Sequence, residues 1–153
     1  MSTTDLKNSK TRKKKSYGKY FLIGSLLVIA DQITKYLSQT YRKDFGILEF
    51  TYLENTGTMF GLFQNNNWFF VLFSIIAIVA LYYYREEFKD QPLFLMFIIS
   101  GIIGNFIDRL FRGYVIDFIN FKIWPVFNLA DTYLVIGVFG FIILTIYTDY
   151  KKN

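Results

Sequence analysis

Two aspartates lie in apolar surroundings, and their residue type points to acid–base chemistry. Asp117 lies within the run Tyr114-Val-Ile-Asp-Phe-Ile119, and Asp131 lies at the start of the long apolar run 129–147. A carboxylate beside hydrocarbon costs about 2.5 to 3.5 kcal/mol on membrane-insertion scales, so such residues usually face a protein interior and mark a functional site. The chain contains no histidine and no cysteine, which excludes Ser-His-Asp triads, thiol nucleophiles and His-based zinc sites.

A pair of carboxylates can carry out hydrolysis without any of these groups. Two carboxylates close together in a low-dielectric environment share a proton, because they cannot both ionise. One can then deprotonate a water molecule while the other protonates a carbonyl oxygen, as in aspartic proteases. We expect the dipole of a helix starting near Asp131 to keep this residue ionised as the base, and Asp117 to hold the proton. We expect no metal site and no cofactor.

Each aspartate also has a structural interpretation. Asn128-Leu-Ala-Asp131 resembles a capping box, in which Asn128 begins a helix and the acid three positions later closes the cap. Asp117 is about as well explained by a salt bridge to Arg109 or Arg112 as by catalysis. The proximity of the two aspartates to one end of the same helix pair favours the catalytic interpretation.

The composition predicts a membrane protein that places these residues with helices. The chain has 153 residues, 53% of them hydrophobic, and the apolar residues are concentrated in long runs. We predict one four-span domain at 20–147, between a basic tail at 1–19 and a short tail at 148–153. We predict four transmembrane helices, at about 20–37, 68–84, 92–107 and 129–147.

The distribution of basic residues predicts the orientation of these helices. Four spans place both termini on one side, where Lys and Arg number 11, against 6 on the other side. The termini are therefore expected to be cytoplasmic, with the connections 38–67 and 108–128 outside. The basic residues at 7–19 precede an apolar run, so we interpret them as a topology signal that meets lipid, and not as a nucleic-acid site.

The first outer connection has strand-like content. Residues 47–53 show partial alternation, with turn residues at Asn55-Thr-Gly57. The predicted fold class is thus an all-α membrane protein, with a small extracytoplasmic β-containing cradle between spans one and two. Two pairs of glycines, Gly101 with Gly104 and Gly137 with Gly140, would let spans three and four approach a neighbouring helix closely.

Other polar residues accompany the aspartates near the ends of the spans. Asp31 and Lys35 are four residues apart, as an ion pair at a helix end would be, with Lys35 reaching towards the interface. Asp108 can pair with Arg112 in the same way. Asn105 and Arg109 share one face of span three, and a buried Asn at membrane depth needs partners, which favours a polar interior.

Five short motifs occur in a fixed order along residues 20–147. They are Asp31-Gln-Ile-Thr-Lys35, Asn55-Thr-Gly-Thr-Met-Phe-Gly61, Gly104-Asn-Phe-Ile-Asp-Arg109, Val115-Ile-Asp-Phe-Ile119 and Phe127-Asn-Leu-Ala-Asp131. With these motifs on a four-span frame, the chain resembles the bacterial lipoprotein signal peptidases, also called signal peptidase II. One departure is that Thr58 and Met59 stand where the family usually has small residues.

The resemblance implies an aspartic endopeptidase of the cytoplasmic (inner) membrane, with its site near the extracytoplasmic face. It would act as a monomer on a diacylglyceryl-modified prolipoprotein, within membrane lipid, and would be inhibited by globomycin. Asp117 and Asp131 match the catalytic pair of the family. Residues matching the peptide- or inhibitor-binding positions are Asn55, Gly57, Asn105, Arg109 and Asn128. Residues matching structural supports are Asp31, Lys35 and Asp108.

Three other functions are weighed against this one. Intramembrane acids can form the path of a small ion or proton transporter, but the polar residues cluster at one end of the spans and form no continuous stripe. A structural subunit would have no need of the acids. A Ser-Lys protease using Ser100 lacks a lysine in span three.

Overall fold

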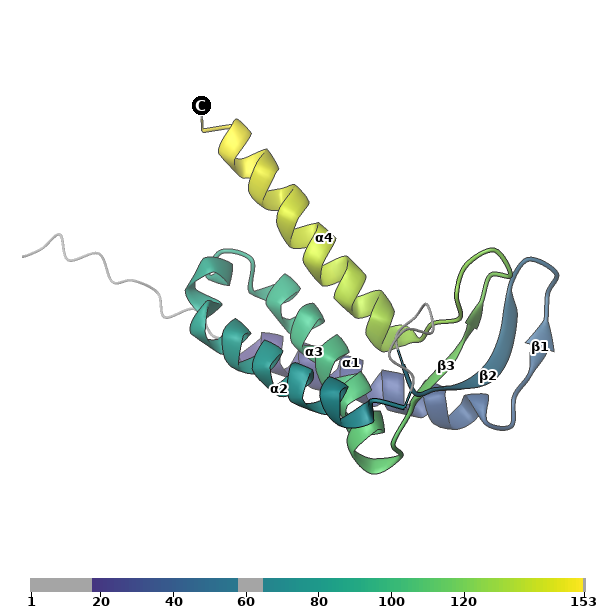
Figure 1. Ribbon diagram of the computed structural model, residues 1–153. Helices are drawn as coiled ribbons and strands as arrows, with labels where there is room; N and C mark the ends of the chain where they lie inside the picture. Colours follow the sequence, from purple (N-terminus) through teal and green to yellow (C-terminus); the bar gives the residue numbers. More distant parts are fainter. Residues whose placement is uncertain (1–17, 58–64, 153) are drawn as a thin grey trace, which may run out of the picture.

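The computed structural model of the chain describes residues 18–57 and 65–152, which form a helical bundle with a small sheet at one end (Figure 1). The positions 58 and 59, where the sequence departs from the family pattern, and most of the basic tail lie outside the described residues. In chain order the elements are α1 (Gly18–Ser38), β1 (Lys43–Asp44), β2 (Glu49–Asn55), α2 (Asn67–Tyr83), the 3-10 helix η2 (Arg85–Phe88), α3 (Pro92–Phe111), β3 (Val115–Asn120) and α4 (Leu129–Tyr150).

The helices are built for an apolar environment. α1, α3 and α4 are long and apolar enough to cross a membrane, whereas α2 is an apolar helix of 17 residues. Large apolar side chains point outwards along them, including Phe21, Trp68 and Ile143, which are 73%, 75% and 65% exposed. An exposed apolar surface of this extent is expected in lipid and not in water. The chain is therefore a multi-pass membrane protein.

α3 lies at the centre of the bundle and contacts each of the other three long helices. The expected close approach through glycine is confirmed where α3 meets α4. A Cβ on Gly137 would lie 2.6 Å from Ile98 Cγ1, and one on Gly140 would collide with the ring of Phe94. A Cβ on Gly104 would lie 2.6 Å from Asp31 Oδ2, so this glycine makes room for the carboxylate of α1.

The three strands form an antiparallel sheet in the order β1-β2-β3. β1 and β2 come from the segment in which the sequence predicted strand content. The sheet is completed by β3, which follows α3, so it is not confined to the connection between the first two helices as expected. β2 and β3 pair with Asn55 opposite Val115 and Leu53 opposite Asp117. Asp117 is therefore held on a paired strand, which fixes its position more tightly than a loop would.

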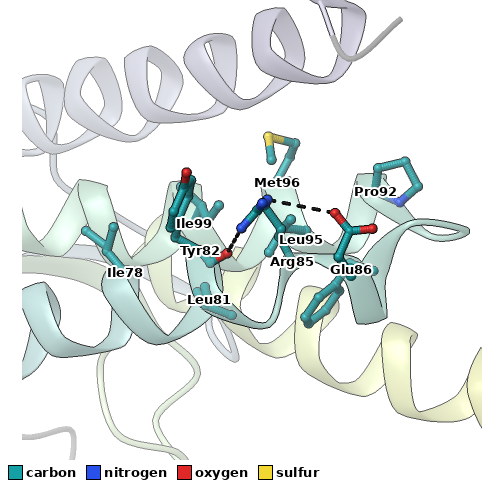
Figure 2. Close-up of a pocket in the computed structure, with 10 residues that line it drawn as sticks. Ile78, Leu81, Tyr82, Arg85, Glu86, Pro92, Leu95, Met96 and Ile99 are labelled. Carbon is teal, nitrogen blue, oxygen red and sulfur yellow. Dashed lines mark hydrogen bonds and ion pairs between the residues drawn. The ribbon is translucent and has the colours of Figure 1, made fainter. Parts of the chain in front are cut away.

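An apolar cavity of about 390 Å³ lies at the opposite end of the bundle from the sheet. Figure 2 shows Arg85 and Glu86 beside this cavity, and its walls come from the end of α2, η2 and the start of α3. The cavity is therefore separate from the polar residues singled out in the sequence, which lie near the other end of α3.

Candidate active site

Five elements bring the predicted polar residues together at the end of the bundle that carries the sheet. α1 supplies Asp31 and Lys35, α3 supplies Asn105, Asp108 and Arg109, and the two aspartates come from β3 and α4. Asn55 ends β2, and Asn128 is the N-cap of α4. Residues up to 99 positions apart in sequence are thus joined directly by hydrogen bonds in one cluster, as the Ala130 N–H is to Asp31 Oδ1.

Asp117 is buried and is held by two neutral amides. Asp117 is only 2% exposed. Asn55 Nδ2 donates to Asp117 Oδ2 at 2.8 Å, and Asn128 Nδ2 donates to Asp117 Oδ1 at 2.7 Å. Asn55 is itself fixed, because its Oδ1 accepts from the backbone N–H of Gly57 at 2.9 Å. The alternative of a salt bridge to Arg109 or Arg112 is not the arrangement found, since amides occupy both carboxyl oxygens.

Asp131 forms the capping box that the sequence indicated. Asn128 Oδ1 accepts from the backbone N–H of Asp131 at 3.0 Å, and Asp131 Oδ2 accepts from the backbone N–H of Asn128 at 3.2 Å. Asp131 Oδ1 accepts a further hydrogen bond from Asn105 Nδ2 at 2.8 Å. The cap therefore fixes this carboxylate at the N-terminus of α4, where the helix dipole favours negative charge.

Asn105 and Asn128 join the two carboxylates into a single network. Asn128 Nδ2 donates to Asn105 Oδ1 at 3.1 Å as well as to Asp117. Asn105 Oδ1 also accepts from Lys35 Nζ at 3.0 Å. With two donors on its oxygen, the Asn105 amide can present only its NH₂ group to Asp131.

Lys35 is completely buried, which differs from the expected lysine reaching towards the interface. Its Nζ lies 2.9 Å from Asp31 Oδ2 and 2.8 Å from Asp108 Oδ2, and all three residues are fully buried. Together with the bond to Asn105, these contacts use all three ammonium donors. The pairing of Asp31 with Lys35 was predicted, but a second carboxylate, from α3, removes the reason for the lysine to seek water.

Two residues that were not singled out as site residues complete this ion cluster. Arg112 contacts Asp108 Oδ1, as the spacing predicted, and also donates to Gln32 Oε1 at 3.2 Å. Gln32 Nε2 lies within 3.2 Å of both Asp31 and Asp108. Gln32 lies between Asp31 and Lys35 in the first sequence motif, and this position could have identified it as a member of the cluster. The cluster balances two carboxylates with two cations.

The Arg109 side chain makes few contacts with the described residues. Its guanidinium donates to Gly57 O at 3.4 Å and lies 4.7 Å from the centre of the Phe70 ring. The backbone carbonyl of Arg109 accepts from Asn67 Nδ2 at 2.8 Å, which ties the end of α3 to the start of α2. A guanidinium has five donors, so Arg109 retains capacity to bind another acceptor.

Burial raises the pKa of Asp117 to about 7, with the neighbouring charge of Asp131 as the second cause. The hydrogen bonds from Asn55 and Asn128 act in the opposite direction, because they stabilise the ionised form. Desolvation is the larger effect. At neutral pH the pair can therefore supply one protonated and one ionised carboxyl group, which is what acid–base hydrolysis of an amide requires. Within the described ranges, 18–57 and 65–152, no three His, Cys, Asp or Glu side chains group as metal ligands.

Comparisons with known proteins all indicate the same class of enzyme. A family model described as signal peptidase (SPase) II matches residues 23–147. A lipoprotein signal peptidase of Brevibacillus brevis is 36% identical over 148 residues, covering 88% of this chain and 98% of the relative. One from Moorella thermoacetica is 42% identical over 130 residues, covering 77% of this chain and 87% of the relative.

Solved structures show the same similarity. Two bacterial membrane enzyme structures obtained by the in meso method superpose with TM-scores of 0.77 and 0.72, at 33% and 34% identity. They match 89% and 84% of this chain, and 92% of each of those chains. The fold and these matches define a membrane-embedded peptidase. The chain belongs to the signal peptidase II family.

The buried ion cluster predicts that Lys35 is essential for stability. Lys35→Met leaves Asp31 and Asp108 with too few cations in a buried site, and we expect a loss of about 3 to 5 kcal/mol in the free energy of unfolding. The matched control is Lys122→Met, which removes the exposed pair with Asp44 and should cost at most about 1 kcal/mol. Chemical denaturation in mixed micelles measures both, and equal losses would contradict this account.

The raised pKa of Asp117 predicts a pH-dependent stability with a definite sign. The folded-state value of about 7 lies above the reference value of 3.8. Its contribution to stability is therefore full below pH 3.8 and lost as the pH rises through about 7. Asp117→Asn removes this loss, so the variant should gain roughly 1 to 4 kcal/mol relative to the parent between acidic and neutral pH.

The control for this titration is Asp44→Asn. The hydrogen bond from Lys122 lowers the pKa of Asp44, so its carboxylate is ionised across the whole window. Its substitution should shift stability without this slope. Parallel stability curves for Asp117→Asn and the parent would show that Asp117 does not titrate near neutrality.

Proposed function

We propose that the chain is an aspartic endopeptidase that removes the signal peptide from prolipoproteins, with Asp117 and Asp131 as the catalytic residues. The observation that carries this proposal is the pair of carboxyl groups joined through Asn128, one on a strand and one at a helix N-terminus. Membership of the signal peptidase II family supports the class of reaction.

In the proposed reaction the two carboxyl groups have different tasks. Asp131, at the N-terminus of α4, accepts a proton from a water molecule, whose oxygen attacks the carbonyl carbon of the scissile peptide bond. Asp117, with its pKa near 7, donates its proton to the carbonyl oxygen. Collapse of the tetrahedral intermediate breaks the C–N bond as the proton held by Asp131 passes to the leaving amine, and a hydroxyl of the intermediate returns a proton to Asp117. The reaction consumes one water and requires no metal or cofactor.

The other polar residues divide into two groups under this proposal. Asn105 and Asn128 donate to the carboxyl groups, so they act first by positioning the pair. Asn55 also donates to Asp117, and the carbonyl of Gly57, which accepts one hydrogen bond from Arg109, can accept a second from an extended peptide. Among the described residues the Arg109 guanidinium donates only to Gly57 O, so it is suited to bind a substrate carbonyl or the ester region of a lipid. Asp31, Lys35 and Asp108 have a structural role, because their ion cluster holds Asn105 through Lys35.

We further propose that α2 is a fourth span. Its 17 residues correspond to a length of about 25 Å at 1.5 Å per residue, which is close to the hydrocarbon thickness of a thin bilayer. Four spans place the tails 1–19 and 148–153 on the cytoplasmic side by the positive-inside rule, with the domain 20–147 between them. The sheet and both aspartates then lie at the extracytoplasmic face of the inner membrane, where the end of a signal peptide emerges.

This location suits a substrate that is itself a membrane anchor. The proposed substrate is a prolipoprotein whose cysteine already carries diacylglyceryl, with cleavage immediately before that cysteine. The acyl chains remain in lipid while the peptide reaches the carboxyl pair. Globomycin-type inhibitors are expected to compete for the same residues. The enzyme is expected to act as a monomer, because the proposed catalytic residues all come from one chain.

The proposal is tested by cleavage of a purified, diacylglyceryl-modified prolipoprotein by the full-length chain in lipid nanodiscs, followed by mass spectrometry. Asp117→Asn and Asp131→Asn should each reduce the rate by on the order of 10²- to 10⁴-fold, because each removes one acid–base group. The matched control, Asp149→Asn, removes an exposed carboxylate near the C-terminal end of α4 and should leave the rate unchanged.

Two further arms make the outcome decisive. Unfolding curves establish that both inactive variants are folded, and the same substrate without diacylglyceryl tests the proposed specificity. Full activity of either Asn variant would end the assignment of the pair, and activity that disappears with chelators would point to metal chemistry instead.

A further inference from the structure

Five large apolar side chains, including Phe121 at 39% exposure, are exposed at the far end of the sheet. We define the sheet tip as residues 45–47, between β1 and β2, together with residues 121–124, after β3. In this tip Ile123 is 90% exposed, Ile47 is 75% exposed, and Phe45 and Trp124 are each 55% exposed. Figure 1 shows the two loops beside each other, away from α1, α2 and α3.

Polar contacts join the two loops of the tip, and Phe45 also packs edge-on against Phe50, with 6.1 Å between the ring centres. Lys122 Nζ lies 2.6 Å from Asp44 Oδ2, which joins the two loops. Lys122 has a positive φ of 62°, and its N–H donates to Asn120 Oδ1 at 2.8 Å, which closes a tight turn. That turn presents Ile123 outwards. Ile123 lies there among the other exposed apolar residues of the tip, and a patch of this kind marks an interaction site.

The surroundings of the tip indicate which partner this is. The sheet projects from the bundle end where α1 stops and α4 begins, and its strands run across the direction of α2 and α3 in Figure 1. Exposed apolar residues continue from the outer surface of α1, through Leu37 and Tyr41, to Phe45. The tip is therefore continuous with a surface that lies in lipid, and it extends sideways over the adjoining leaflet.

The composition of the tip fits the polar boundary of a membrane. Trp is enriched where lipid headgroups meet hydrocarbon, Phe can bury its ring at the same boundary, and lysine can bury its stem there while its ammonium reaches the phosphates. Basic residues exceed acidic ones at this edge, with Arg42, Lys43 and Lys122 against Asp44 and its cross-strand partner Glu49. Lys43 Nζ lies 5.0 Å from the centre of the Phe45 ring, so charge and aromatic surface are presented together.

We propose that the sheet tip inserts into the headgroup region of the membrane and acts as a second anchor beside the helices. Because β3 runs directly from this tip to Asp117, the anchor sets the height of Asp117 relative to the lipid surface. Only this consequence for Asp117 rests on the proposed function. Insertion itself is a property of the tip residues, and it is measured without substrate or cleavage.

The test uses the intrinsic fluorescence of Trp124. The chain has two tryptophans, so Trp68→Phe leaves Trp124 as the only one. The full chain is reconstituted in phosphatidylcholine vesicles whose acyl chains are brominated near the headgroup or near the methyl end. Bromine near the headgroup should quench Trp124 about twofold, and deep bromine much less, because tryptophan rests at the interface.

A pair of variants separates insertion from mere proximity. Ile47→Asn with Ile123→Asn should abolish the quenching and shift the emission to longer wavelength. The conservative Ile47→Leu with Ile123→Leu should retain both signals. Absence of quenching in the Trp68→Phe protein would overturn the proposal. Quenching that appears only with bound prolipoprotein would also overturn it. Quenching that depends on the protein-to-lipid ratio would show the tip packed against a second copy, and would also overturn it.

Discussion

The structure depends on one buried ammonium group that three acceptors share. Lys35 Nζ contacts Asp31, Asp108 and Asn105, and no part of Lys35 is exposed. Burying charge in a membrane protein is costly unless every charge is paired and every donor is used. This cluster meets both conditions, and it does so with residues from two helices. It therefore fixes α1 against α3 at the level of the two aspartates.

The orientation of the neutral amides follows from that ammonium. Because Asn105 directs its oxygen to Lys35, it directs its NH₂ group to Asp131. Asn128 then spans the remaining gap, donating to Asn105 and Asp117 while capping α4. The Lys35 ammonium thus sets the orientation of the Asn105 amide, and Asn105 in turn accepts from Asn128. Asp117 and Asp131 receive hydrogen bonds from amides, and neither forms a direct ion pair with a cation. The pKa of Asp117 therefore stays near 7.

Much of this arrangement follows from the sequence, and the rest depends on contacts between distant residues. Spacing alone predicts the Asp31–Lys35 and Asp108–Arg112 pairs, the capping box at Asn128, and the close approach at Gly137. These are all local or depend on residue size. The burial of Lys35 depends on Asp108, 73 positions away, and so local rules predicted an interfacial lysine instead. The pairing of β3 with β2 was missed because Asp117 interrupts a short apolar run that gives no clear alternation.

The central claim is that the pair holds one proton near neutral pH, and that Asp117 carries it. Infrared spectroscopy of the full-length chain in lipid, with ¹³C-labelled aspartate, detects the C=O stretch of a protonated carboxyl group directly. Just below the pKa of about 7, we expect one such band that disappears in Asp117→Asn and persists in Asp131→Asn. A band that persists in Asp117→Asn and is lost in Asp131→Asn would reverse the roles of the two residues. The absence of any protonated band would contradict the shared proton itself.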